Sequence, residues 1–302
     1  MAGSQSPWLR RQATRRRFVR RAVSRFMPGE TLDDALAAAA ALDARGLGTV
    51  LTHLGENITA AAEAEAVRRH YLEVLGRLPA AGLDAEVSVK LTQLGLDLDL
   101  DLAAEHARCL AERSAAHGRR LWIDMESSAY VDRTLEVYRR VREREPGVGL
   151  CVQAYLHRTA RDLQALVPLG AAVRVVKGAY QEPAGNAMRR KRDVDESFFR
   201  LCERLLAEDA RRAGCRLTIA THDRDLIGRL AAGASARGVP LEAYEIAMLY
   251  GIQRPEQARL AAVGHRVRVL ISYGDSWFPW YMRRLAERPA NVWFVARGLL
   301  GG

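Results

Sequence analysis

The 302-residue sequence has few cysteines and no long apolar run, and each shortage excludes a class of protein. Its four cysteines lie far apart and form no Cys-x-x-Cys pair, so neither a disulfide framework nor a zinc site is indicated. The longest apolar stretch, Ala35 to Leu42, is far shorter than the roughly 20 residues that a membrane-spanning helix needs. No apolar segment near the start resembles a signal peptide. We therefore expect a globular protein of the reducing cytoplasm.

Acidic residues are missing from the first 29 residues, whose eight arginines supply +8 of the net charge of +10. Apolar residues such as Trp8 and Phe18 interleave with these arginines, as in a basic helix lying on an anionic membrane surface. A nucleic-acid contact is one alternative, and a packing helix or tail with solvated arginines is another. We treat residues 1–29 as a basic N-terminal segment and residues 30–302 as one large domain.

A glycine-rich GxGxxG loop is also absent, which removes the main sign of a dinucleotide-binding doubly wound sheet. Eight short β-branched runs predict strands, and the 3.6-residue patterns between them predict crossover helices. The predicted strands are Thr49–Leu54, Glu86–Leu91, Leu121–Met125, Gly149–Tyr155, Ala172–Lys177, Arg216–Ala220, Leu241–Ala247 and Val267–Ser272. The clearest predicted helices are Ala60–Leu78, Val131–Val141 and Asp195–Ala213. This alternation predicts an α/β protein with a TIM-type (βα)8 barrel, and Thr31–Arg45 is expected to form an extra N-terminal helix.

Polar residues gather at the predicted strand ends, where the βα loops of a barrel converge and form its site. Arg174 interrupts an apolar strand, where an unpaired charge would be costly, so it needs an anionic partner. Asp124 could be that partner in a purely structural ion pair. Because Lys90 and Lys177 add further charge, we expect a mouth too basic for internal pairing, and therefore an anionic ligand.

Adjacent arginines, Arg283 and Arg284, open an amphipathic pattern that runs from Trp280 to Ala290. Two neighbouring guanidinium groups on a helix can clamp a small carboxylate. The plain alternative is a solvated helix face in which both arginines pair with Glu287.

Four blocks of the sequence, in register, resemble the proline dehydrogenase family between about Val50 and Val295. They are Ser88–Leu96, Val175–Tyr180, Met248–Ile252 and the helix that carries Arg283 and Arg284. The length resembles that of the small monofunctional bacterial members.

This resemblance implies a flavin-binding catalytic barrel that oxidises L-proline to Δ1-pyrroline-5-carboxylate and passes the electrons to a quinone. FAD would lie across the carboxyl-end face, and the final helix would cover the barrel mouth. A quinone acceptor implies peripheral contact with the inner face of the membrane. The product could pass to a pyrroline-5-carboxylate dehydrogenase, and no nucleic-acid partner is expected.

The resemblance also assigns roles to individual residues. Lys90, Arg283 and Arg284 would hold the substrate carboxylate, and Tyr273 would line the substrate pocket. Asp124 would organise the site electrostatically, and Arg174 would lie beside the flavin ring. Contacts to FAD are further implied for Met125, Gln153, Lys177, Gly178, Ala179, Tyr180, Thr221 and His222, with Glu287 bracing the arginine helix. Plain alternatives remain: Gln153 could be a satisfied barrel residue, and His222 could belong to a helix N-cap turn with Asp223.

Two positions depart from the family pattern. Trp280 stands where a tyrosine is usual, three residues before the first arginine, and could reshape the substrate pocket. Ala247 stands where a glutamine is frequent and could remove a contact to the flavin.

Other functions are weaker alternatives. A barrel like methylenetetrahydrofolate reductase would not need adjacent arginines over its mouth. A Schiff-base aldolase would need Lys90 or Lys177 as a desolvated nucleophile. A metal hydrolase could recruit four candidate ligands but lacks a paired-histidine motif. These candidates are His53, Asp124, Glu126 and His222. A nucleic-acid binder would rest on the arginine-rich segment alone.

Overall fold

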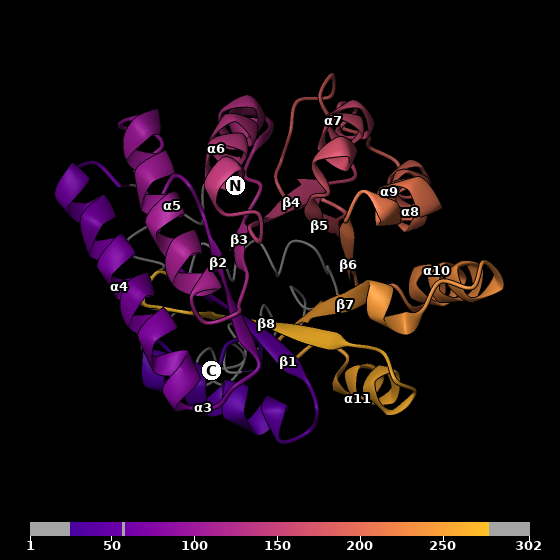
Figure 1. The fold of residues 1–302 in the computed structure, drawn as a ribbon, viewed down its shortest axis with the longest axis horizontal. Helices are drawn as coiled ribbons and strands as arrows, with labels where there is room; N and C mark the ends of the chain where they lie inside the picture. The colour runs from indigo at the N-terminus through magenta and orange to yellow at the C-terminus, as the bar shows by residue number, and fades with distance from the viewer. Residues whose placement is uncertain (1–24, 56–57, 278–302) are drawn as a thin grey trace, which may run out of the picture.

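The computed structural model describes residues 25–55 and 58–277, and in this part of the chain eight parallel strands close into a barrel (Figure 1). Each strand pairs with the next along the chain, and β8 pairs with β1 over six residue pairs from Gly48↔Arg268 to His53↔Tyr273. The strands are β1 (Gly48–His53), β2 (Ala85–Val89), β3 (Leu121–Ile123), β4 (Gly149–Gln153), β5 (Ala172–Val176), β6 (Arg216–Ala220), β7 (Tyr244–Leu249) and β8 (Val267–Tyr273).

All eight predicted strands are confirmed, and so is the TIM-type barrel. The largest error in their bounds concerns β7. Residues Leu241–Ala243 form a 3-10 turn after Pro240, so the strand begins at Tyr244 and continues to Leu249. The predicted strand therefore started three residues too early.

Helices surround the barrel and bury their apolar faces against the strands (Figure 1). They are α3 (Leu32–Asp43), α4 (Ala61–Ala80), α5 (Leu100–Ala115), α6 (Val131–Arg144), α7 (Thr159–Leu166), α8 (Lys191–Leu206), α9 (Glu208–Arg212), α10 (Arg224–Ala236) and α11 (Arg254–Ala262). The single helix predicted over Asp195–Ala213 is divided into α8 and α9, because Ala207 adopts an extended conformation with ψ of 149°.

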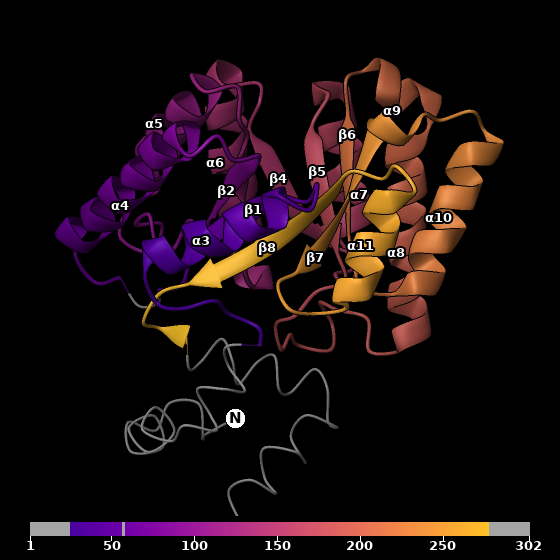
Figure 2. The same ribbon diagram turned by 90° about the horizontal axis from the view of Figure 1, so that it is seen from below.

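The extra helix predicted before the first strand is confirmed as α3, which lies along β1 and β8 (Figure 2). Its start is fixed by a capping box, in which Thr31 and Asp34 satisfy each other's backbone N–H groups. Residues 1–24 of the basic segment and the whole of Trp280–Ala290 lie outside the described residues, so the final helix stays a prediction. Within the described residues, no helix is long and apolar enough to cross a membrane.

Candidate active site

A cavity of about 420 Å³ opens at the carboxyl ends of the strands, where the sequence placed the site. Its wall combines apolar side chains, among them Met248, Leu249 and Ile252, with charged and polar ones. Eleven of the residues proposed for the site line this cavity: Lys90, Asp124, Met125, Gln153, Arg174, Lys177, Gly178, Ala179, Tyr180, Thr221 and His222. The structure therefore brings together, in one cavity, residues from five different strands, β2 to β6, and from the loops that follow these strands.

Asp124 is the centre of the charged part of this cavity, held between two cations. Lys90 Nζ donates to Asp124 Oδ2 at 2.7 Å, and Arg174 forms an ion pair with Asp124 Oδ1. Burial favours the protonated acid, but the charges of Lys90 and Arg174 outweigh it and lower the pKa of Asp124. Burial likewise disfavours the charge on Lys90, yet Asp124 outweighs it and raises the lysine pKa. All three groups are therefore ionised near neutral pH.

These contacts correct the expectation that the basic residues of the mouth would lack internal partners. Lys177 is paired as well, because its Nζ lies 2.5 Å from Asp195 and 2.9 Å from Asp223. Asp195 and Asp223 are 18 and 46 residues away along the chain, so the sequence did not show that they would meet the lysine. What remains is an excess of one positive charge in the cluster of Lys90, Arg174 and Asp124.

Arg174 is only 6% exposed and is enclosed by groups that stabilise its charge. Its guanidinium carbon lies 5.0 Å from the centre of the Trp122 ring, within the range of a cation–π contact. Its Nη2 also donates to Ser88 Oγ at 2.8 Å. The predicted ion pair between Arg174 and Asp124 is thus confirmed. Both residues also line the cavity.

His222 and its neighbour Asp223 have structural contacts beside the cavity. Asp223 is the N-cap of α10 and accepts a hydrogen bond from the backbone N–H of Leu226 at 3.3 Å. His222 Nε2 accepts from the backbone N–H of Leu249 at 2.9 Å, which joins the ends of β6 and β7. The N-cap interpretation is therefore confirmed for the turn, and His222 still lines the cavity.

Two buried polar atoms on the cavity wall have no hydrogen-bond partner among the described residues. They are Gln153 Oε1 and Thr52 Oγ1. Gln153 Nε2 does donate to the carbonyl of Met125, at 3.3 Å, so only one end of this amide is satisfied. A buried acceptor without a donor costs free energy, so a ligand that supplies an N–H or O–H here would be stabilised.

Gly178 allows the chain to turn between Lys177 and Tyr180 at the edge of the cavity. Its φ is +118°, and a Cβ added there would lie 2.3 Å from the Tyr155 ring. Only glycine therefore fits this turn against the aromatic wall.

Tyr273 does not line the described part of the cavity. It is fully buried, and its hydroxyl lies 2.8 Å from His70 Nε2, beside His53. Burial lowers the pKa of His53 to about 4 and also lowers that of His70, so both rings are neutral at pH 7. The proposed roles of Arg283, Arg284 and Glu287 concern residues outside the described part, and these roles stay predictions.

Several residues that build the site were missed by the sequence reasoning. Ser88 and Trp122 contact Arg174. Glu126 was considered only as a metal ligand, and it instead accepts hydrogen bonds from the Thr92 backbone at 3.1 Å and from its hydroxyl at 2.7 Å. Burial raises the pKa of Glu126. One signal was available: Ser88 precedes Lys90 by two residues, and alternate residues of a strand share a face.

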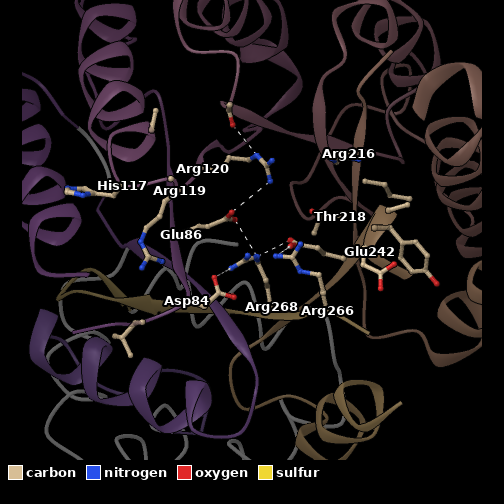
Figure 3. A pocket seen from close by; sticks show the side chains of 18 of the residues that line it. Asp84, Glu86, His117, Arg119, Arg120, Arg216, Thr218, Glu242, Arg266 and Arg268 are labelled. Carbon is tan, nitrogen blue, oxygen red and sulfur yellow. Dashed lines mark hydrogen bonds and ion pairs between the residues drawn. The ribbon is translucent and has the colours of Figure 1, made fainter. Parts of the chain in front are cut away.

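A second and larger cavity, of about 920 Å³, lies at the opposite end of the barrel (Figure 3). Its centre is the buried Arg268, which approaches three carboxylates: Glu245 at 2.9 Å, Asp84 at 3.0 Å and Glu86 at 3.6 Å. Arg266 also approaches Glu245, at 3.3 Å, and Arg120 approaches Glu86, at 3.8 Å. These six side chains carry three charges of each sign and form a neutral ion-pair network.

The two strongest competing chemistries receive no support from this geometry. An aldolase lysine must be neutral to attack a carbonyl, whereas the pKa of Lys90 is raised and Lys177 contacts two carboxylates. In the described part of the chain, no three His, Cys, Asp or Glu side chains come together as a metal site.

The fold and the cavity at the carboxyl ends of its strands define a barrel enzyme with a charged active site. Comparison with known proteins specifies which kind. The family model described as proline dehydrogenase matches residues 35–297. Proline dehydrogenase 1 of Bacillus subtilis strain 168 is 35% identical over 93% of this chain and 92% of its own length. Proline dehydrogenase of Deinococcus radiodurans is 37% identical over 93% of this chain and 90% of its own. The chain therefore belongs to the proline dehydrogenase family of oxidoreductases.

Solved structures agree on the fold. The proline utilization A protein of Bdellovibrio bacteriovorus superposes with a TM-score of 0.81 at 23% identity, over 88% of this chain. This chain spans only 32% of the length of that protein, so the likeness concerns one barrel of a longer chain.

Proposed function

We propose that this enzyme oxidises L-proline to Δ1-pyrroline-5-carboxylate with FAD as cofactor and a quinone as electron acceptor. Membership of the family supports proline oxidation, the first step of proline catabolism. The observation that carries the proposal for this site is the cluster of Lys90, Asp124 and Arg174. It leaves one uncompensated positive charge in a cavity large enough for a small amino acid.

The cavity wall fits a flavin ring, which has two apolar faces and a polar edge. Met248, Leu249 and Ile252 supply apolar surface, while Gln153 Oε1 and Thr52 Oγ1 are buried atoms in need of a partner. Lys177, Gly178, Ala179, Tyr180, Thr221 and His222 are further residues proposed to hold the cofactor. When bound, FAD supplies the acceptor for a hydride from the proline ring carbon next to nitrogen, and the two electrons then reduce the quinone.

The substrate carboxylate is proposed to bind at Lys90, with Arg283 and Arg284 completing the clamp. Lys90 stays protonated because Asp124 raises its pKa, so it presents a fixed charge to the carboxylate. Asp124 in turn holds Lys90 and Arg174 apart at a fixed spacing, which orients the bound substrate.

The test is a visible spectrum of the FAD-loaded protein under anaerobic conditions, before and after addition of L-proline, with D-proline as control. We expect flavin bands that bleach with L-proline and recover when a short-chain quinone is added. A protein that never shows flavin bands would contradict the cofactor. Bands that persist with L-proline would contradict the substrate, and failure to recover with quinone would contradict the acceptor.

We also propose that the basic segment, residues 1–29, brings the enzyme to the inner face of the membrane, where quinone is dissolved. Its eight arginines provide the charge that attracts anionic lipid. Deletion of residues 1–27 should abolish sedimentation with anionic vesicles, and unchanged sedimentation would contradict this role. Transfer of the product to a pyrroline-5-carboxylate dehydrogenase is a further prediction.

A further inference from the structure

We propose that Ser88 is a positioning residue, whose hydroxyl fixes Asp124 and Arg174 relative to each other. This inference rests on the proposed function in one respect: it concerns the same site. Ser88 is not one of the residues whose role the family resemblance supplied, and its side chain does not line the cavity.

Ser88 bridges the two ions from below the cavity. It lies on β2, is fully buried, and donates through Oγ to Asp124 Oδ1 at 2.7 Å. The same oxygen accepts a hydrogen bond from Arg174 Nη2 at 2.8 Å. An ionised carboxylate only accepts and a guanidinium only donates, so the single hydroxyl proton must point to Asp124. The orientation of this hydroxyl is therefore determined by its two neighbours.

The hydroxyl supplies a restraint that the ion pairs alone lack. Asp124 Oδ2 is held by Lys90, and Oδ1 is shared between Ser88 and Arg174. Without Ser88, the carboxylate keeps one contact on each oxygen and gains freedom to rotate about its terminal torsion. Arg174 would lose one acceptor and keep its contacts with the Trp122 ring, the carboxylate and the Cys151 side chain.

The predicted consequence is a loss of turnover rather than of substrate affinity. Ser88→Ala leaves Lys90, the proposed carboxylate ligand, paired with Asp124, so KM for L-proline should change by less than about threefold. If Arg174 lies beside the flavin ring, as the proposed function requires, its displacement should lower kcat roughly tenfold.

The matched control is Ser114→Ala. Ser114 is equally buried, but its Oγ donates to the carbonyl of Leu110 at 2.9 Å in the last turn of α5, next to Ala115, which lines the cavity at the other end of the barrel. It should cost a similar amount of stability and leave kcat unchanged. Equal kcat values for the two variants, or a loss at Ser88→Ala seen only in KM, would overturn the proposal.

A second measurement needs neither cofactor nor substrate. Urea unfolding of the FAD-free protein is measured for Ser88→Ala, Asp124→Asn and the double variant at pH 7. If the hydroxyl acts on Asp124, the two changes should be non-additive by roughly five- to tenfold in the unfolding equilibrium constant. Ser114→Ala combined with Asp124→Asn should be additive, and additivity in both cycles would contradict the proposal.

A second double-variant cycle combines Ser88→Ala with Arg174→Lys and tests the hydrogen bond from Arg174 to Ser88. Because Arg174→Lys keeps the positive charge, this cycle can be measured even if the Asp124→Asn protein does not fold. If the wild-type protein fails to oxidise L-proline, the proposed function is contradicted. The unfolding cycles would still decide the role of Ser88, so the two failures are distinguishable.

Discussion

The two mouths of the barrel both contain buried ion pairs between basic and acidic side chains, but the sign of the central charge differs. It is negative at the carboxyl ends of the strands and positive at the amino ends. At the carboxyl ends of the strands, one carboxylate, Asp124, lies between Lys90 and Arg174, and these three groups together carry a net charge of +1. At the amino ends, one arginine, Arg268, lies among three carboxylates, and two further arginines restore neutrality. The cavity at the amino ends is the larger, about 920 against 420 Å³. A choice of active site by cavity volume alone would therefore point to the amino end, where Arg268 and its neighbours pair with one another.

The dipoles of the surrounding helices add to this difference. In a (βα)8 barrel the helix N-termini follow the carboxyl ends of the strands, so their partial positive charges reinforce the +1 cluster. The helix C-termini lie at the other mouth, where arginines compensate them. The helix dipoles therefore favour an anionic substrate at the carboxyl-end mouth.

Trp122 separates the two charged layers and contacts both. Arg174 lies over its ring at 5.0 Å and Arg120 at 5.3 Å, while Nε1 donates to Glu86 at 2.6 Å.

The largest effect is expected for Asp124→Asn, which leaves two buried cations without their shared anion. We expect a loss of roughly 3 to 5 kcal/mol in the free energy of unfolding and a fall of roughly 100- to 1000-fold in kcat/KM. The matched variant at the other mouth is Glu245→Gln, after which Arg268 still approaches Asp84 and Glu86. It should cost about 1 kcal/mol and leave kcat unchanged. Equal losses of activity in Asp124→Asn and Glu245→Gln would contradict the proposal that only the carboxyl-end mouth is the active site.

Lys90→Met should come next, because it removes the uncompensated charge and leaves the Arg174–Asp124 pair in place. Since a hydrogen bond to a charged group is worth about 1.5 to 3 kcal/mol, kcat/KM for L-proline should fall about 10- to 100-fold, mainly through KM. Steady-state kinetics with purified, FAD-saturated protein would show it. An unaltered KM would mean that Lys90 does not meet the substrate.

Trp122→Phe should affect both mouths, since it shortens the ring under Arg174 and removes the donor to Glu86. We expect a loss of about 1 to 3 kcal/mol in stability and a fall of about three- to tenfold in kcat. Trp277→Phe is the matched control, because it also removes a buried indole that donates to a carboxylate, Glu30, at 2.9 Å. A kcat loss of the same size in the control would refute a specific role for Trp122.

The smallest effect is expected for Asp223→Asn, at the rim of the carboxyl-end mouth. Asparagine caps a helix as well as aspartate does, so the loss is that of the ion pairs with Lys177 and Lys191, at a cost of about 1 kcal/mol at pH 7. Burial alone would raise the pKa of Asp223, but the hydrogen bond from Lys177 helps to lower it to about 2 from its ordinary 3.8. The stability that this depressed pKa contributes is present above about pH 4 and disappears as the pH falls toward 2. Urea unfolding of both proteins should show a difference that shrinks over that range; a constant difference would point to the cap instead.

The barrel was predictable because each strand is a short β-branched run between longer helical patterns, and this alternation is local in the sequence. The position of the site followed from the strand ends, and eleven proposed residues meet there. The pair of Arg174 with Asp124 was predicted, because a charge inside an apolar strand needs a partner and Asp124 was the candidate at a strand end of the predicted barrel. The partners of Lys177 were not predictable, since Asp223 lies 46 residues away and meets the lysine only through barrel closure. Ser88 was missed because a buried serine is not distinctive by itself, and its spacing of two residues from Lys90 was the one sign that it faces the site.

The central claim is that the uncompensated positive charge at the carboxyl-end mouth selects a substrate carboxylate. Its most direct test is anaerobic titration of the FAD-loaded protein with L-proline and with L-prolinamide, which keeps the ring and lacks the carboxylate. We expect L-proline to bleach the flavin bands and L-prolinamide to leave them unchanged at equal concentration. Equal bleaching by the two compounds would show that the charge cluster does not select the carboxylate, and would contradict this account.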